Sequence, residues 1–174
     1  EQGQLDVALM PSIELAKHEG WETLLDCGAI VSDGPARTML AIASQPWSKV
    51  ERIACDVHAR TTTALAQVLF AHLDELGPHV ARKWEVAEVV AGRIPGGFDA
   101  VIVSGEAALC WPGYHAMTGE LQRDGQHVVD LGGLWTQWTG LPFVSLVWGA
   151  REGRDIGEWH EILHGATKIG VDKI

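Results

Sequence analysis

Short apolar runs that alternate with helical patterns are the feature that most limits how this chain can fold. Asp99–Val103 and Phe143–Trp148 are almost continuously apolar, which is typical of strands buried on both faces of a sheet. Arg60–Thr63 opens a segment with apolar residues at helical spacing, namely Leu65, Val68, Leu69 and Leu73. Strands that alternate with helices predict an α/β fold with mostly parallel strands.

Other segments extend this alternation towards both ends of the sequence. Leu5–Leu9 reads as a strand, and the turn residues Pro11 and Ser12 separate it from a short helical pattern. Thr38–Ala43 is a further strand candidate, and Ile156–His164 is predicted to be an amphipathic helix. The apolar content of 47% in 174 residues is enough to build a substantial core.

The charge of the chain limits which partners it can bind, and its cysteines indicate the cellular compartment. The formal charge is −10, and the 13 lysines and arginines stand singly rather than in a basic stripe, so we expect neither nucleic acid nor membrane lipid as a partner. Cys27, Cys55 and Cys110 have no CxxC spacing and lie beside apolar residues, which favours buried free thiols. Free thiols and the lack of an apolar run long enough for a span predict a cytoplasmic protein.

Three predicted strand-to-helix turns carry small polar residues. They contain Ser12, then Arg60, Thr61 and Thr62, and finally Ser104, Gly105 and Glu106. Ligands of parallel α/β sheets bind at the carboxyl ends of strands, where helix N-termini offer free N–H groups to anions. The alternative is that these hydroxyls only cap helices, which Ser and Thr commonly do. Arg37 and Arg60 are further candidates for pairing with a carboxylate.

A possible zinc motif lies near the end of the sequence. His160, Glu161 and His164 fit the HExxH pattern, in which one helix face offers two imidazoles to zinc and a glutamate acts as base. The extended form of the motif is broken, because Thr167 and Gly170 stand where a glycine and a third histidine would be. We therefore expect no metal site, but a helix with Trp159, Ile162 and Leu163 facing inward and both histidines outward.

Several segments, in order, resemble the MqnA-type chorismate dehydratase family of menaquinone biosynthesis. The matching segments are Leu5–Glu14, Ile30–Pro35, Ala59–Thr62, Asp130–Gly132 with Trp135, and Trp138–Val144 with Trp148. The resemblance implies a type II periplasmic-binding-protein-like fold of two α/β lobes, shortened here at both ends. One lobe would hold residues 1–45 and 145–174, and the other residues 50–142.

The resemblance also implies a reaction, a pathway and a set of site residues. The family dehydrates chorismate to 3-(1-carboxyvinyloxy)benzoate in the futalosine route to menaquinone and needs no cofactor. Substrate-binding residues carried over from the family, with the wall of the cleft included, are Ser12, Arg60, Thr61, Thr62, Gly105 and Glu106. The sequence identifies no catalytic base. A non-catalytic solute-binding protein of the same fold, holding a small carboxylate, is the alternative.

Overall fold

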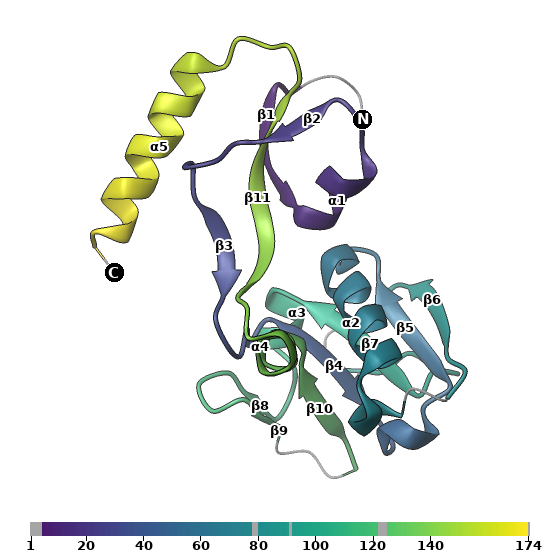
Figure 1. Ribbon diagram of the computed structural model, residues 1–174. Helices are drawn as coiled ribbons and strands as arrows, with labels where there is room; N and C mark the ends of the chain where they lie inside the picture. The colour runs from purple at the N-terminus through teal and green to yellow at the C-terminus, as the bar shows by residue number, and fades with distance from the viewer. Residues whose placement is uncertain (1–4, 78–79, 91, 122–124, 174) are drawn as a thin grey trace. The chain divides into compact units, whose positions relative to one another are not determined.

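The computed structural model describes residues 5–77, 80–90, 92–121 and 125–173, and the chain forms two compact units (Figure 1). Unit 1 comprises residues 1–31 and 144–174, and unit 2 comprises residues 32–143. The chain therefore passes from one unit to the other twice. The sequence placed residues 32–45 in the first lobe, whereas the structure groups them with unit 2, because their strand lies inside the sheet of that unit.

Unit 1 is an antiparallel sheet with two helices. Its strand order is β1-β11-β2, and β3 also pairs with β11. The elements are β1 (Val7–Pro11), α1 (Ser12–Lys17), β2 (Trp21–Thr23), β3 (Ala29–Ser32), β11 (Phe143–Arg151) and α5 (Gly157–Val171). A small core of Leu24, Cys27 and Ala150 joins the sheet to α5 through Leu163. Within the described part of the chain, no helix is both long and apolar enough to cross a membrane.

Unit 2 is built on a mixed sheet of five strands in the order β10-β4-β7-β5-β6. The strands are β4 (Met39–Ala43), β5 (Arg52–Asp56), β6 (Lys83–Ala87), β7 (Ala100–Ser104) and β10 (His127–Asp130). β5 runs parallel to β6 and β7, whereas β4 runs antiparallel to both β7 and β10. The prediction of mostly parallel strands is therefore wrong. The pattern of apolar residues shows that a strand is buried, but it does not show in which direction the strand runs.

Both faces of this sheet are covered, as the apolar runs predicted. Along β7, Ala100 and Ile102 belong to one core cluster while Val101 and Val103 belong to the other. This alternation follows from the opposite directions of successive side chains in a strand. The first cluster packs under α2 (Arg60–His72) and α4 (Leu131–Thr139). The second packs under α3 (Glu106–Leu109) and the hairpin of β8 (Tyr114–His115) and β9 (Glu120–Leu121).

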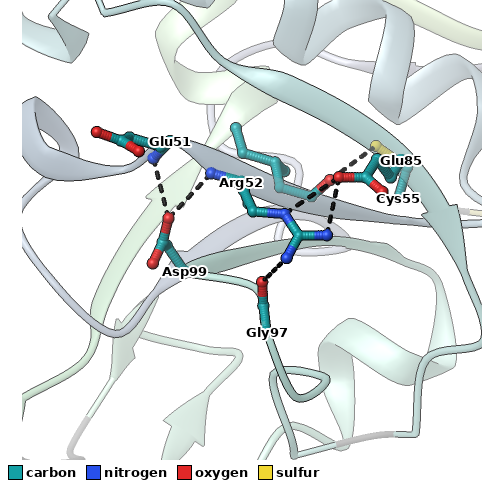
Figure 2. A network of polar contacts seen from close by, with 7 residues as sticks. Glu51, Arg52, Cys55, Glu85, Gly97 and Asp99 are labelled. Carbon is teal, nitrogen blue, oxygen red and sulfur yellow. Dashed lines mark hydrogen bonds and ion pairs between the residues drawn. The ribbon is translucent and has the colours of Figure 1, made fainter.

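A polar network joins the starts of β5 and β7 to the middle of β6 (Figure 2). The Oδ2 atom of Asp99 accepts hydrogen bonds from the backbone N–H groups of Glu51 and Arg52, at 3.0 and 2.9 Å. The Arg52 side chain donates to Glu85 Oε1 on β6 and to the carbonyl oxygen of Gly97, which precedes β7. These bonds tie β5, β6 and the segment before β7 together on one side of the sheet.

The three cysteines are free, and two of them are buried. Burial raises the pKa of the Cys55 thiol, as it does that of Cys27, where the charge of Asp26 adds to the effect. Cys110 is exposed, which corrects the expectation that all three are buried. It follows the last residue of the four-residue helix α3, where the chain turns along the surface.

Candidate functional site

The carboxyl ends of the parallel strands of unit 2 bring several predicted site residues to one edge. β5 and β7 are adjacent and parallel, so the helices that follow them, α2 and α3, begin at the same edge of the sheet. β10 ends there too, because its last residue, Asp130, pairs with Leu40 at the start of β4. Three helix N-termini therefore meet at this edge, which Figure 1 shows opposite the starts of β5 and β7.

The N-terminus of α2 is open, in the sense that no side chain of the protein caps it. Its N-cap residue is Ala59, and its first turn holds no acidic residue. The first N–H group bonded to Ala59 O is that of Thr63, at 2.7 Å. The N–H groups of Arg60, Thr61 and Thr62 consequently lie outside the helix's own ladder, at the positive end of the helix dipole.

The N-terminus of α4, in contrast, is filled by the protein itself. Asp130 is its N-cap, and the Oδ1 atom accepts a hydrogen bond from Gly133 N at 2.9 Å. The same carboxylate accepts from Ala36 N at 2.9 Å and from Arg37 N at 2.7 Å. An intramolecular anion thus caps this helix end, whereas the carboxylate just before α2, that of Asp56, accepts from His58 N at 2.9 Å and does not cap the helix. In the sequence, Asp130 stands out only as part of the segment that resembles the family.

The hydroxyl groups of the first turn of α2 differ in their surroundings. The Oγ1 atom of Thr61 is buried and has no hydrogen-bond partner within the described residues. The Thr62 side chain is only 3% exposed and packs inside the unit. An unsatisfied buried hydroxyl costs free energy unless a ligand or water completes it. Thr61 is therefore better suited than Thr62 to offer a side-chain donor, while Arg60 lies exposed at the helix start.

Gly105 and Glu106 lie one strand away, at the end of β7. Gly105 has φ 61° and ψ −132°, a conformation essentially restricted to glycine. Its N–H donates to Thr38 O at 2.9 Å, which joins the turn to the start of β4. The Glu106 carboxyl group is exposed rather than partly buried. Because its charge would repel a carboxylate, an anion is better placed at α2 than at α3.

Ser12 is the one predicted site residue that lies in unit 1. It begins α1, directly after β1, as the strand-turn-helix pattern predicted. Its Oγ donates a hydrogen bond to Val144 O at 2.9 Å. The structure thus groups Arg60, Thr61, Thr62, Gly105 and Glu106 at one edge of unit 2, with Ser12 in the other unit.

The HExxH histidines attach α5 to the turn that follows β2. His160 Nε2 lies 3.3 Å from Leu25 O, and His164 Nδ1 lies 2.8 Å from Asp26 O. Thr167 Oγ1 donates to Cys27 O at 2.7 Å, so three side chains of one helix face bind three successive carbonyl groups. Among the residues that the structure describes, no group of three or more His, Cys, Asp and Glu is placed to hold a metal ion.

The predicted orientation of α5 is wrong. Trp159 and Ile162 are 56% and 52% exposed, whereas both histidines contact the rest of unit 1. Only Leu163 of the three apolar residues packs against a core cluster. The carbonyl oxygens of the turn supply the imidazoles with acceptors, an interaction that hydrophobic spacing along the helix does not reveal.

Replacing His164 by alanine is expected to loosen α5. One hydrogen bond to a backbone carbonyl is worth about 0.5–1.5 kcal/mol, so amide exchange in α5 should accelerate by about fivefold. Hydrogen exchange of the parent and variant measures this directly. Glu161→Ala, an exposed change on the same helix, should leave the exchange rates nearly unchanged. Zinc bound at one equivalent by the parent and lost in His164→Ala would instead support the metalloprotease motif.

A hollow of about 460 Å³ lies near the other end of α2, lined by Leu73, Asp74, Glu75, Leu134, Gln137 and Trp138. Asp74 and Glu75 give it a negative charge that disfavours an anionic ligand. Its position among the residues that follow α2 separates it from the first turn of that helix. This hollow is therefore not a continuation of the candidate site.

Comparison with known proteins adds a family and a fold. Residues 1–174 match a family model described as "Menaquinone biosynthesis". The crystal structure of protein AF1704 from Archaeoglobus fulgidus is similar, with a TM-score of 0.60 at 17% identity over 91% of this chain and 53% of that one. The GluR0 ligand-binding core in complex with L-glutamate matches with a TM-score of 0.46 at 13% identity, over 94% of this chain and 66% of that one. The chain spans about half of the length of AF1704. The prediction of an α/β fold in two lobes is confirmed.

Proposed function

Because the chain belongs to the MqnA-type menaquinone-biosynthesis family, as its match over residues 1–174 establishes, we propose that it takes part in dehydrating chorismate to 3-(1-carboxyvinyloxy)benzoate. Chorismate carries two carboxylates and a six-membered ring that becomes aromatic when water leaves. The proposal includes a cytoplasmic location, which the three free cysteines support.

The open N-terminus of α2 is the observation that carries this proposal. Of the two longer helices that begin at the carboxyl edge of unit 2, α4 is capped by Asp130, whereas α2 has an alanine N-cap and no acid in its first turn. N–H groups that lie outside a helix's own ladder, together with the helix dipole, form a site for an anion. The buried Thr61 hydroxyl, which has no hydrogen-bond partner among the described residues, belongs to the same first turn.

Positioning is the main contribution required of such a site. Dehydration removes a proton and a hydroxide from neighbouring ring carbons, and aromatisation supplies much of the driving force. Residues that fix the ring by its carboxylate therefore reduce the entropic part of the barrier, which can amount to several kcal/mol. A donor near the departing hydroxide would lower the barrier further. In this proposal Arg60, Thr61 and Thr62 hold a carboxylate, and Gly105 and Glu106 form the neighbouring wall.

The direct test is turnover of chorismate by the purified protein, followed by chromatography of the product. Appearance of 3-(1-carboxyvinyloxy)benzoate above the uncatalysed rate is the expected result, and it should fall in the variants of Thr61 described below. If chorismate raises the melting temperature but no product forms, the protein binds a carboxylate without converting it. If it neither binds nor converts chorismate, the proposal is wrong.

A further inference from the structure

Helix α5 turns a polar face towards unit 1 and exposes large apolar side chains on its other side. His160 and His164 lie against the carbonyl groups of residues 25 and 26, and Leu163 is the large apolar side chain that packs inward. Ile162 and Ile169 are 52% and 60% exposed. An ordinary surface helix buries its apolar face instead. An exposed apolar face of this kind is typical of a surface that binds another molecule.

The exposed side chains follow the spacing with which one helix packs against another. Trp159, Ile162, Ala166 and Ile169 are separated by three, four and three residues, so they form one stripe along α5, called here the α5 stripe. Ala166 is exposed like the other three, and a Cβ atom built on the neighbouring Gly165 would meet open space. Because small side chains reduce the distance between packed helices, a second helix can approach closely at the middle of the stripe.

The charged residues beside the α5 stripe change sign along the helix. Glu158 and Glu161 lie in its first half, and Lys168 lies in its last turn. Glu161 and Lys168 are seven residues apart, which is about two turns, so both lie on the same side of the helix. Ile162 and Ile169 have the same spacing. If two copies of α5 pair antiparallel, Glu161 of each faces Lys168 of the other, whereas parallel pairing would bring like charges together.

We propose that the α5 stripe binds the α5 stripe of a second copy of this chain, with the two helices antiparallel. A two-fold axis beside Ala166 brings Ile162 of each copy to Ile169 of the other, and Glu161 to Lys168. The contact is self-complementary, as a two-fold dimer requires. This inference does not depend on the proposed reaction, because α5 belongs to unit 1 and the candidate carboxylate site belongs to unit 2.

The charge and the length of α5 indicate a weak dimer rather than a helix bound to lipid. Helices that lie on membranes are rich in lysine and arginine, but here Glu158 and Glu161 flank the stripe and the formal charge of the chain is −10. α5 has 15 residues, so it is about 22 Å long. One pair of such helices buries less than the roughly 800 Å² per partner of a standard interface, and we expect a dissociation constant of about 10–100 μM.

Sedimentation equilibrium of the full chain over about 1–500 μM tests the dimer directly, since self-association depends on concentration. The buffer must contain a reducing agent, because the exposed Cys110 could otherwise link two chains. The average mass is expected to rise from that of one chain towards that of two. The mass of one chain at every concentration would overturn the proposal, whatever other partner α5 binds.

Ile162→Asp places a charge in the middle of the α5 stripe and should weaken dimerisation by about 10-fold or more, because burying an unpaired charge is costly. Met117→Asp is the matched control: Met117 is 84% exposed and lies in unit 2, so the same kind of change should leave the dissociation constant unaltered. Circular dichroism checks that both variants are folded. A dimer that Ile162→Asp does not weaken would form through another surface, and the assignment would be wrong.

Exchanging the two charges tests the antiparallel arrangement. Glu161→Lys or Lys168→Glu alone turns two attractions of the dimer into two repulsions and should weaken it by about 3- to 10-fold. The double variant re-forms both pairs with reversed signs and should recover to within about threefold of the parent. If the substitutions acted only on the stability of α5, their effects would add. A double variant as weak as either single variant would overturn the antiparallel pairing.

Discussion

Thr61→Asp is expected to reduce chorismate binding by about 100-fold or more while the fold is retained. A carboxylate in the first turn of α2 would occupy the N–H groups that the substrate needs and would repel a dianion a few ångströms away. At the same time an acid at this helix end interacts favourably with the dipole, by about 0.3–1 kcal/mol. Stability and binding should therefore change independently, which calorimetric titration and urea unfolding can measure on the same samples.

Thr61→Asn is the matched control, since asparagine has nearly the shape of aspartate without its charge. It should lose less than about tenfold in affinity, because the neutral amide neither repels the dianion nor competes as strongly for the N–H groups. Equal losses in the two variants would mean that shape rather than charge matters at Thr61. Retained affinity in Thr61→Asp would rule out the N-terminus of α2 as the carboxylate site.

Asp130→Ala is expected to lower the free energy of unfolding by about 2–4 kcal/mol. The change removes the N-cap of α4 and leaves the N–H groups of Ala36, Arg37 and Gly133 without their acceptor. Loss of a cap costs about 1 kcal/mol, and hydrogen bonds to a charged group are worth about 1.5–3 kcal/mol each but do not add fully. Urea unfolding followed by tryptophan fluorescence suits the measurement, because Trp135 and Trp138 lie on α4.

Asp130→Asn tests the roles of the two carboxylate oxygens separately. An asparagine can keep the Oδ1 acceptor for Ala36 N and Gly133 N, but its amide nitrogen would face the N–H of Arg37 in place of Oδ2. We expect a smaller loss of stability than in Asp130→Ala, because only the N–H of Arg37 loses its acceptor. A loss below about 0.5 kcal/mol in Asp130→Ala would show that this carboxylate does not hold the loop.

The patterns that predicted the elements correctly were local ones. The apolar run at β7 is buried on both faces, and the spacing of Leu65, Leu69 and their neighbours gave α2. The direction of a strand, in contrast, is not recorded in its local sequence. β4 is as apolar as β7 and yet is antiparallel to it. A buried strand needs apolar residues whichever way it runs, so the sequence pattern cannot distinguish a parallel from an antiparallel neighbour.

Single residues were misjudged where a contact from a distant segment decided their role. His160 and His164 match a zinc motif, but the carbonyl groups that they contact come from residues 25 and 26. Cys110 stands among apolar residues and is nevertheless exposed, since α3 ends there. Spacing within a helix shows which side chains share a face, and it does not show what that face meets.

The sequence by itself determined the family, the α/β class and the helix start that carries Arg60, Thr61 and Thr62. Each of these depends on residue types at short spacing, which motifs and periodicity record. Only the tertiary structure decided that Asp130 caps α4 while no side chain caps α2, and that the same carboxylate binds the backbone of Ala36 and Arg37. The bond from Ala36 N to Asp130 joins residues 94 positions apart. Such bonds depend on how the strands are ordered, and that order is fixed by packing the whole sheet rather than by any one segment.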